Sequence, residues 1–297
     1  LAGAVWLMRR TLFPVGDGVG LWGSAQCVST GDCSGQDLSG ADLRDQDLTG
    51  VRFTNANLNR AILGGANLTQ ADLSGATVLQ ADLTNVNLTS ANLSGVDLKY
   101  QNLLGVSLAG ANLSNANLTG ARLWGRPTTD LASATLVGAN FTGQTFSSAN
   151  GTTLNWAGKD LTGVNLTGAN LTGADLSRAN LTGAELAGVN LTRANLTDAT
   201  LPGPGFLSPL VSATLTGANL TNVDLSGADL SRMDLTGTIL AGANLARTKL
   251  KSANLTDASL VNATLTGADL TGADLTRADL LGAGMLDTTL TAVVWKD

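Results

Sequence analysis

Histidine is absent from the 297-residue sequence, aromatic residues make up only 4% of it, and charged residues only 13%. Histidine is the side chain that most often acts as a general base or metal ligand near neutral pH. Its absence excludes Ser–His and Cys–His catalytic pairs and disfavours a zinc site. The sequence also lacks an apolar run long enough to span a bilayer and a glycine-rich phosphate loop before a helix. We therefore expect no enzyme activity, cofactor, metal ion or membrane span.

Charge is scarce as well. Lys and Arg together number 17 and Asp and Glu 23, which gives a formal net charge of −6. This charge is modest for the length, and we expect no nucleic-acid partner. The carboxylates recur at one position of a repeated pattern, which explains them without catalysis.

A five-residue pattern takes the place of ordinary secondary-structure periods. From Asp160 to Leu201 the chain repeats a small residue, Asn or Asp, Leu, Thr or Ser, and often Gly. Five matches neither the helical period of about 3.6 nor the strand period of two. It fits a short extended segment plus a corner. We call the Leu position the centre; the centre and the residue two before it should point inward, and the Asn or Asp between them outward. Gly, Asn and Asp recur at the corner because they tolerate positive φ.

This A(D/N)Lxx pattern resembles the consensus of the pentapeptide-repeat family, and the resemblance covers the chain from Gln36 to Trp295. It implies an all-β fold, a right-handed quadrilateral β-helix (β-solenoid) with four repeats per coil. At that number of repeats the chain makes about 13 coils, stacked roughly 4.8 Å apart. Members of the family differ in use, and some mimic DNA and bind type II topoisomerases. Only the inward structural positions carry over to this chain.

Irregular stretches suggest how the chain is organised. Residues 1–35 lie outside the repeat as an apolar N-terminal arm and cysteine loop, and residues 36–297 form one solenoid. Two insertions divide the solenoid into blocks 36–123, 129–206 and 213–295. We interpret the insertions as surface loops, because a domain boundary would cut the leucine columns. The arm either docks onto a partner or caps its own first coil.

Cys27 and Cys33 are the only cysteines and lie six residues apart beside the first repeats. They are either a short-loop disulfide, which would imply an oxidising compartment, or two free thiols.

DNA mimicry requires carboxylates ordered down one side of the solenoid, where residues four repeats apart share a face. Two such outward rows consist of Asp42, Ile62, Asp82, Asn102 and Arg122, and of Asp229, Lys249, Asp269 and Thr289. Neither row is a continuous acidic stripe, so a DNA mimic that binds a type II topoisomerase is an alternative hypothesis. Ice binding is a second alternative, but no face is a regular row of threonines.

A structural role is the preferred hypothesis. The predicted surface consists mainly of Asn, Thr, Ser and Gly, and the final centre, Trp295, is followed by no capping helix, although solenoid ends usually need a polar cap. We expect an extracellular or cell-surface fibre or surface-layer subunit that stacks head to tail with its own copies; a cytoplasmic location is the alternative. Val293 and Val294 could instead plug the lumen of a monomer together with Trp295. The assembly candidates are Trp6, Trp22, Val293 and Trp295.

Glycans are a further expected partner if the chain is secreted. The repeat consensus itself contains Asn-Leu-Thr, so cytoplasmic relatives could carry the same sequons without being glycosylated. Asn150, Asn170 and Asn190 are spaced by four repeats and are expected to stack too closely for three glycans. The candidate sites are Asn67, Asn87, Asn92, Asn112, Asn117, Asn140, Asn150, Asn165, Asn170, Asn180, Asn190, Asn195, Asn219, Asn254 and Asn262.

Overall fold

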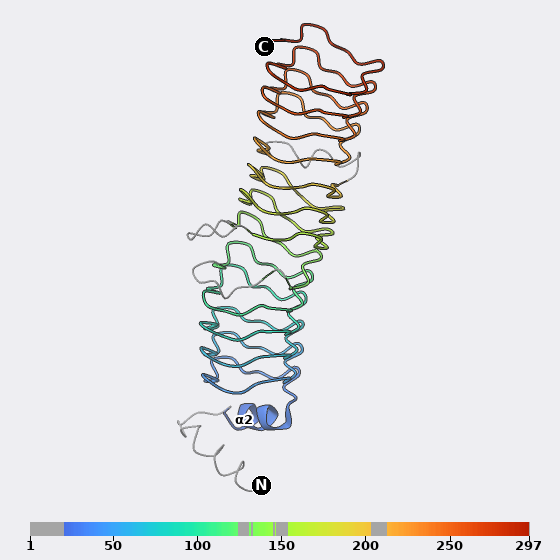
Figure 1. The fold of residues 1–297 in the computed structure, drawn as a ribbon. Coiled ribbons are helices and arrows are strands. Elements are labelled where there is room, and N and C mark those ends of the chain that lie inside the picture. The colour runs from blue at the N-terminus through green and yellow to red at the C-terminus, as the bar shows by residue number, and fades with distance from the viewer. Residues whose placement is uncertain are drawn as a thin grey trace.

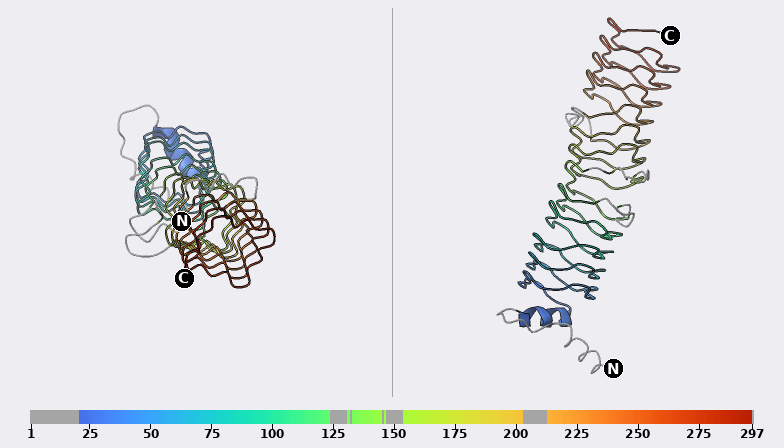
Figure 2. Two further views of the ribbon diagram at one scale, coloured as in Figure 1. Left: turned by 90° about the horizontal axis from the view of Figure 1, so that it is seen from above. Right: turned by 90° about the vertical axis from the view of Figure 1, so that its left-hand side faces the viewer.

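The computed structural model describes residues 21–123, 131, 133–144, 146, 154–202 and 213–296, with the side chains of 21–25 left out. Helix α2 (Leu21–Thr30) comes first, and a long stack of four-sided coils follows it (Figure 1). Seen from above, the coils lie over one another, and seen from the side they form an extended, slightly bent rod (Figure 2).

Parallel pairing between successive coils sets the register. Arg52 pairs with Asp32 in the preceding coil and with Asp72 in the following one, and each partner lies four repeats away along the chain. Each repeat therefore forms one side of a four-sided coil. Every paired segment is a single-residue bridge rather than a longer strand, because a corner follows each centre.

The side-chain pattern within each repeat follows from this geometry. Leu171 is a centre and is 1% exposed, and Ala169, two residues earlier, is fully buried. The second residue after the centre has positive φ, as in Asn55 (57°) and Gly65 (71°). The inward and outward positions predicted from the five-residue pattern are those observed, and the core is a continuous column of Leu and Ala.

The solenoid begins at Asp32, one repeat earlier than the predicted boundary at residue 36. Cys33 occupies a centre position, is fully buried, and donates its N–H to the Arg52 carbonyl at 2.7 Å. This repeat was not predicted from the five-residue pattern, because its centre is Cys instead of the usual Leu.

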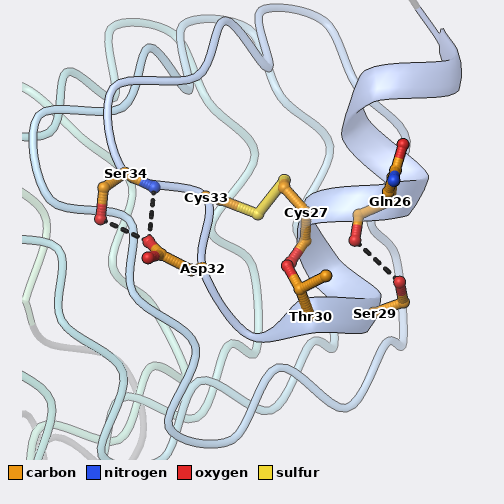
Figure 3. The surroundings of a disulfide bond; sticks show 7 residues. All are labelled: Gln26, Cys27, Ser29, Thr30, Asp32, Cys33 and Ser34. Atoms are coloured by element: carbon orange, nitrogen blue, oxygen red, sulfur yellow. Dashed lines mark hydrogen bonds between the residues drawn. A yellow bond between two sulfur atoms is a disulfide. The ribbon is translucent and has the colours of Figure 1, made fainter.

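Helix α2 covers the open end of the first coil (Figure 1). Val28 packs against the core, and a disulfide with an S–S distance of 2.04 Å joins Cys27 of α2 to Cys33 of the coil (Figure 3). In the same region Asp32 Oδ1 accepts hydrogen bonds from the N–H and hydroxyl of Ser34. This part of the predicted arm therefore caps its own solenoid, and residues 1–20 lie outside the described part of the chain.

Three places in the stack contain extra residues. Asn117 pairs with Asn140, Asn140 with Asn165, and Asn195 with Asn219, and these separations exceed the regular four repeats by three, five and four residues in turn. The two insertions predicted from sequence account for the extra three and four residues. The extra five, between Asn140 and Asn165, were not predicted.

Asn170 pairs with Asn190 in the following coil, as expected from the sequence. The extra pentapeptide corrects the other half of the expectation, that Asn170 stacks on Asn150. Asn170 donates its N–H to the Gln144 carbonyl at 2.7 Å and accepts the Phe146 N–H at 2.9 Å, so it stacks on the segment around Phe146. Asn150 itself lies outside the described residues. Because five residues are one whole repeat, leaving them out of the stack does not change the sequence phase, and the pattern shows no break.

Crosslinking distinguishes the observed register from the one expected from sequence phase. We expect Asn140→Cys with Asn165→Cys to react with a short bifunctional thiol reagent, because these residues are bridge partners and paired parallel strands lie about 4.8 Å apart. Asn140→Cys with Asp160→Cys is the control, since this pair has the regular spacing of four repeats but is not bridged. Crosslinking yield is read by mass spectrometry, and preferential reaction of the control pair would contradict the observed register.

Candidate functional site

The outward Asn residues form hydrogen-bond ladders between coils. Asn67 Oδ1 accepts bonds from the N–H (3.2 Å) and hydroxyl (2.6 Å) of Thr69 in its own repeat. Its Nδ2 donates to Asp47 Oδ1 at 3.3 Å and to Thr49 Oγ1 at 2.9 Å in the preceding coil. The polar coat is therefore part of the scaffold as well as the solvent-facing surface.

The outward carboxylates make the same local bonds. Asp160 Oδ1 accepts the hydroxyl of Thr162 at 2.6 Å and its N–H at 3.0 Å, and these bonds lower the pKa of Asp160. The pKa of Asp274 is lowered in the same way by the hydroxyl and then the N–H of Thr276. Among the described residues, no group of three or more Cys, Asp or Glu side chains is arranged to hold a metal ion.

Ion pairs interrupt the acidic rows. Lys249 Nζ lies 3.5 Å from Asp229 Oδ2 in the coil below, and Lys251 Nζ lies 3.1 Å from Asp269 in the coil above. Arg277 makes two hydrogen bonds of 2.6 Å to Asp257, also one coil away. These pairs are solvent-exposed, so their contribution to stability is small. Lys249 and Lys251 place positive charge beside the carboxylates of an outward row, whereas the Arg277–Asp257 pair lies at a corner.

A shallow opening lies between two neighbouring coils. It has a volume of about 350 Å³ and is lined by Ser133, Ala134, Thr135 and Val137 of one coil and by Ala157–Asp160 of the next. In the described part of the chain, the bond from the Leu136 N–H to the Asp160 carbonyl that a regular stack would contain is missing here. Two of the lining residues are charged: Lys159 is half-buried and Asp160 is exposed.

The last coil exposes several large apolar side chains. Val293 packs partly against the core. In the described chain, the centre N–H groups of this coil donate to no further coil, unlike that of Leu275, which donates to the Val294 carbonyl at 2.9 Å. We name this surface the C-terminal edge, and it comprises Leu281 (74% exposed), Leu286 (69%), Leu290 (40%), Val294 (38%) and Trp295 (52%).

The structure brings only some of the predicted assembly residues together. Val293 and Trp295 lie on the last coil, at the opposite end of the rod from α2 (Figure 1). Trp6 and the side chain of Trp22 lie outside the described part of the chain. Leu281 and Leu286 were not predicted, although a signal was present: both stand directly after a centre, where Thr or Ser is usual.

The predicted glycosylation residues fall into two structural groups. Every predicted glycosylation residue that the structure describes, except Asn262, is an outward residue directly before a centre. Asn262 instead occupies a corner with φ 56° and is exposed. No helix in the described residues has the length and apolarity needed to cross a membrane.

Repeat content defines the class of protein. A family model for pentapeptide repeats matches eight stretches, at residues 32–65, 52–89, 66–99, 89–125, 160–198, 213–251, 243–282 and 253–291. The chain therefore belongs to the pentapeptide-repeat family, and its fold is the right-handed quadrilateral β-helix of that family. This confirms the family resemblance stated from the A(D/N)Lxx pattern.

Solved structures of other pentapeptide-repeat proteins are similar to this chain. HetL, involved in heterocyst differentiation regulation in the cyanobacterium Nostoc sp., shares 24% identity over 94% of this chain and 98% of HetL, with a TM-score of 0.22. A trypsin-treated form of QnrB1, a plasmid-mediated fluoroquinolone resistance protein, shares 17% identity over 80% of this chain and 90% of its own, with a TM-score of 0.34.

A thylakoid-lumen pentapeptide-repeat protein of Arabidopsis thaliana shares 31% identity over 38% of this chain and 66% of its own, with a TM-score of 0.21. No curated protein matches the sequence. The TM-scores are all low, so we transfer no function from these structures.

The lowered pKa values predict acid sensitivity. A carboxyl whose folded pKa lies below its unfolded value of about 3.9 contributes stability at higher pH, and this contribution is lost as pH falls through the folded pKa. We therefore expect the melting temperature to be nearly constant from about pH 7 to pH 5 and to fall below about pH 4. Replacing Asp160 and Asp274 with Asn should reduce this fall, because the amide keeps the Oδ1 acceptor but does not titrate.

The matched control is Asn140→Asp. Asn140 accepts the N–H and hydroxyl of Thr142 as Asp160 does from Thr162, so the substitution adds a titrating group at an equivalent site. It should steepen the loss of stability in acid. Melting curves of all variants that shift in parallel with pH would show that these bonds do not control the acid response.

Proposed function

We propose that the chain is a non-catalytic structural subunit that associates end to end, with the C-terminal edge as its contact surface. The observation that carries this proposal is the gathering of Leu281, Leu286 and Trp295 at the one described end of the solenoid that no helix covers. On the rod between the ends, outward side chains are mainly hydrogen-bonded Asn, Asp, Thr and Ser.

Burial of this edge is favourable on two counts. Covering a large apolar side chain stabilises a contact by about 1.5–3 kcal/mol before the costs of association are subtracted. The open backbone of the last coil also presents N–H and C=O groups in strand geometry, which is a template for pairing with another chain. Both features favour a partner that presents a complementary end rather than a small ligand.

The partner that we propose is a second copy of this chain. Helix α2 covers the first coil, so head-to-tail stacking would place the C-terminal edge against α2, which contains Trp22. Trp6 precedes α2 in the sequence. Such a contact joins two different surfaces and does not close on itself, so it builds a fibre rather than a ring or a dimer.

The disulfide supports an extracellular or cell-surface setting. Cys27–Cys33 ties the cap to the first coil, and disulfides persist mainly in oxidising compartments. The outward side chains are mainly neutral and hydrogen-bonded, which is compatible with this setting. A DNA mimic that binds a type II topoisomerase is less well supported, because Lys249 and Lys251 pair with the carboxylates of the row that contains Asp229 and Asp269. Ice binding has no regular threonine face to support it.

The assembly proposal predicts the effect of two substitutions at the C-terminal edge. The wild-type chain should form long fibres in negative-stain images and particles larger than a monomer in light scattering. Leu281→Asp with Leu286→Asp should shift it to monomers, because both side chains are exposed and the change puts charge into the contact. Ile239→Asp is the control: Ile239 is 41% exposed but lies on the side of the rod.

The outcomes separate the parts of this proposal. A wild-type chain that stays monomeric at high concentration would remove end-to-end association altogether. Discrete dimers that the double substitution dissolves would keep the edge as the interface but replace the fibre by a closed pair.

Glycosylation provides a separate test of the extracellular setting. A glycan is attached to Asn Nδ2, and in ladder residues such as Asn92 this atom donates to the neighbouring coil, here to Asp72 Oδ1 at 2.9 Å. Asn262 makes no such bond among the described residues and is exposed at a corner. For chain secreted from a glycosylating host, site-resolved mass spectrometry should find Asn262 occupied and Asn92 largely free. The reverse distribution would contradict the structural basis of this expectation.

A further inference from the structure

One corner of the rod carries apolar side chains far from the C-terminal edge. Leu79 is 65% exposed and Tyr100, the only tyrosine, is 70% exposed. Leu79 and Lys99 are four repeats apart, as are Gln80 and Tyr100, so the four residues occupy the same corner of two neighbouring coils. Arg60 lies on this corner one coil below, where its Nε donates to Gln80 Oε1 at 3.2 Å. We call Arg60, Leu79, Gln80, Lys99 and Tyr100 the corner patch.

The backbone ladder is open on both sides of the corner patch. Within residues 21–123, the pairings of Thr77 with Asp97 and of Asp82 with Asn102 are missing, and so are the bonds that would join the two coils along these faces. On the opposite faces the same two coils pair normally, as Asn87 does with Ser107. The coils therefore separate locally on the side that carries the patch.

Gln101 explains the separation. It occupies the inward position two before a centre, where Ala or Val is usual, and it is buried (8% exposed). Its Nε2 donates to the Val78 carbonyl at 2.7 Å, across the gap between the coils. A side chain of this size at this position holds the two coils apart, and its amide replaces one of the lost ladder bonds.

The corner patch is basic on an acidic chain. Lys99 Nζ lies 4.9 Å from the centroid of the Tyr100 ring, and Arg60 bonds to the neutral Gln80. Neither cation has an ion pair among the described residues. The nearby carboxylates of Asp82 and Asp97 lie on the flanking faces, so two cations and an aromatic ring face solvent together.

The Tyr100 ring is supported from the next coil. It lies over Gly120, where an added Cβ would come within 2.5 Å of the ring atom Cδ1. The glycine therefore provides the space in which the ring can lie against the corner. An aromatic ring held flat beside a cation is a common anchor for protein partners.

We propose that the corner patch is a docking site for an acidic peptide segment that carries large apolar side chains. Arg60 and Lys99 would pair with its carboxylates, and Leu79 and Tyr100 would contact its apolar side chains. The patch combines two cations with two large apolar side chains, which suits a polypeptide segment better than a sugar. The complementary charge commits the site to an acidic partner.

Fluorescence anisotropy with a synthetic peptide tests this proposal. The probe is a fluorescein-labelled hexapeptide with the composition Asp-Glu-Leu-Phe-Glu-Asp, and the control probe replaces its acidic residues with Lys and Arg. Both are added to full-length chain carrying Leu281→Asp and Leu286→Asp, so that the result does not depend on end-to-end assembly. We expect saturable binding of the acidic probe, weakened by salt, and no saturable binding of the basic one.

Substitutions locate the binding. Tyr100→Ala and Leu79→Ser should each weaken it about tenfold or more, as is typical when an anchor is removed, whereas the exposed lateral control Ile239→Ala should leave it unchanged. Gly120→Ala should also weaken it, by displacing the ring without removing it. Its matched control is Gly50→Ala, which has the same positive φ (67° against 63°) but open space around the added Cβ.

The following results would overturn the proposal: no saturable binding of the acidic probe, equal binding of both probes, or wild-type affinity in Tyr100→Ala and Leu79→Ser. Binding of vesicles with anionic headgroups at the patch, without peptide binding, would replace the peptide by a membrane and overturn it as well. The end-to-end proposal is unaffected by any of these results, because the probes are tested on chain whose C-terminal edge has been altered.

Discussion

Each coil is held by the coil above and the coil below, and the rest of the structure depends on this stacking. The Leu171 N–H donates to the Asn190 carbonyl at 2.8 Å, and the side chain of Leu171 is buried in the leucine column. A single coil can satisfy neither its backbone nor its apolar face, so stability comes from contacts between neighbours. The outward polar side chains add to these contacts through hydrogen-bond ladders between coils. Positions where a coil has no paired neighbour are therefore exceptions in this structure.

The two proposed interaction surfaces lie where a coil lacks a neighbour or where two coils do not pair regularly. Where stacking is regular, the outward Asn, Asp and Thr side chains bond to their own repeat or to the next coil, and few groups remain for a partner. At the C-terminal edge the stack presents leucines and unpaired backbone, and at the corner patch Gln101 opens the ladder beside Leu79 and Tyr100. The first surface suits another copy of the chain, whereas the second is smaller, lateral and basic, and suits a short acidic segment.

Part of each surface could be predicted from residues alone. Trp295 and Val293 were identified because they follow the last repeats, but Leu281 and Leu286 were missed even though they break the Thr or Ser position after the centre. Leu79 breaks the same position. The open ladder could not be predicted, because four repeats have Gln at the inward position and the effect of Gln101 appears only when the two coils are placed together. The six-residue spacing of Cys27 and Cys33 left pairing undecided, and only the position of α2 against the first coil brings the two residues into a disulfide.

The sequence by itself determined the shape of one repeat and the family of the protein. A small residue, Asn or Asp, and Leu followed by a corner allow one alternation of inward and outward side chains, because the leucines must be buried and the corner requires positive φ. Tertiary structure decided which repeats lie on one another. Omitting a whole pentapeptide between Phe146 and Asn170 leaves the five-residue phase intact, so the sequence cannot distinguish a repeat that stacks from one that does not. Only the backbone bonds between coils, which join residues four to five repeats apart, settle that choice.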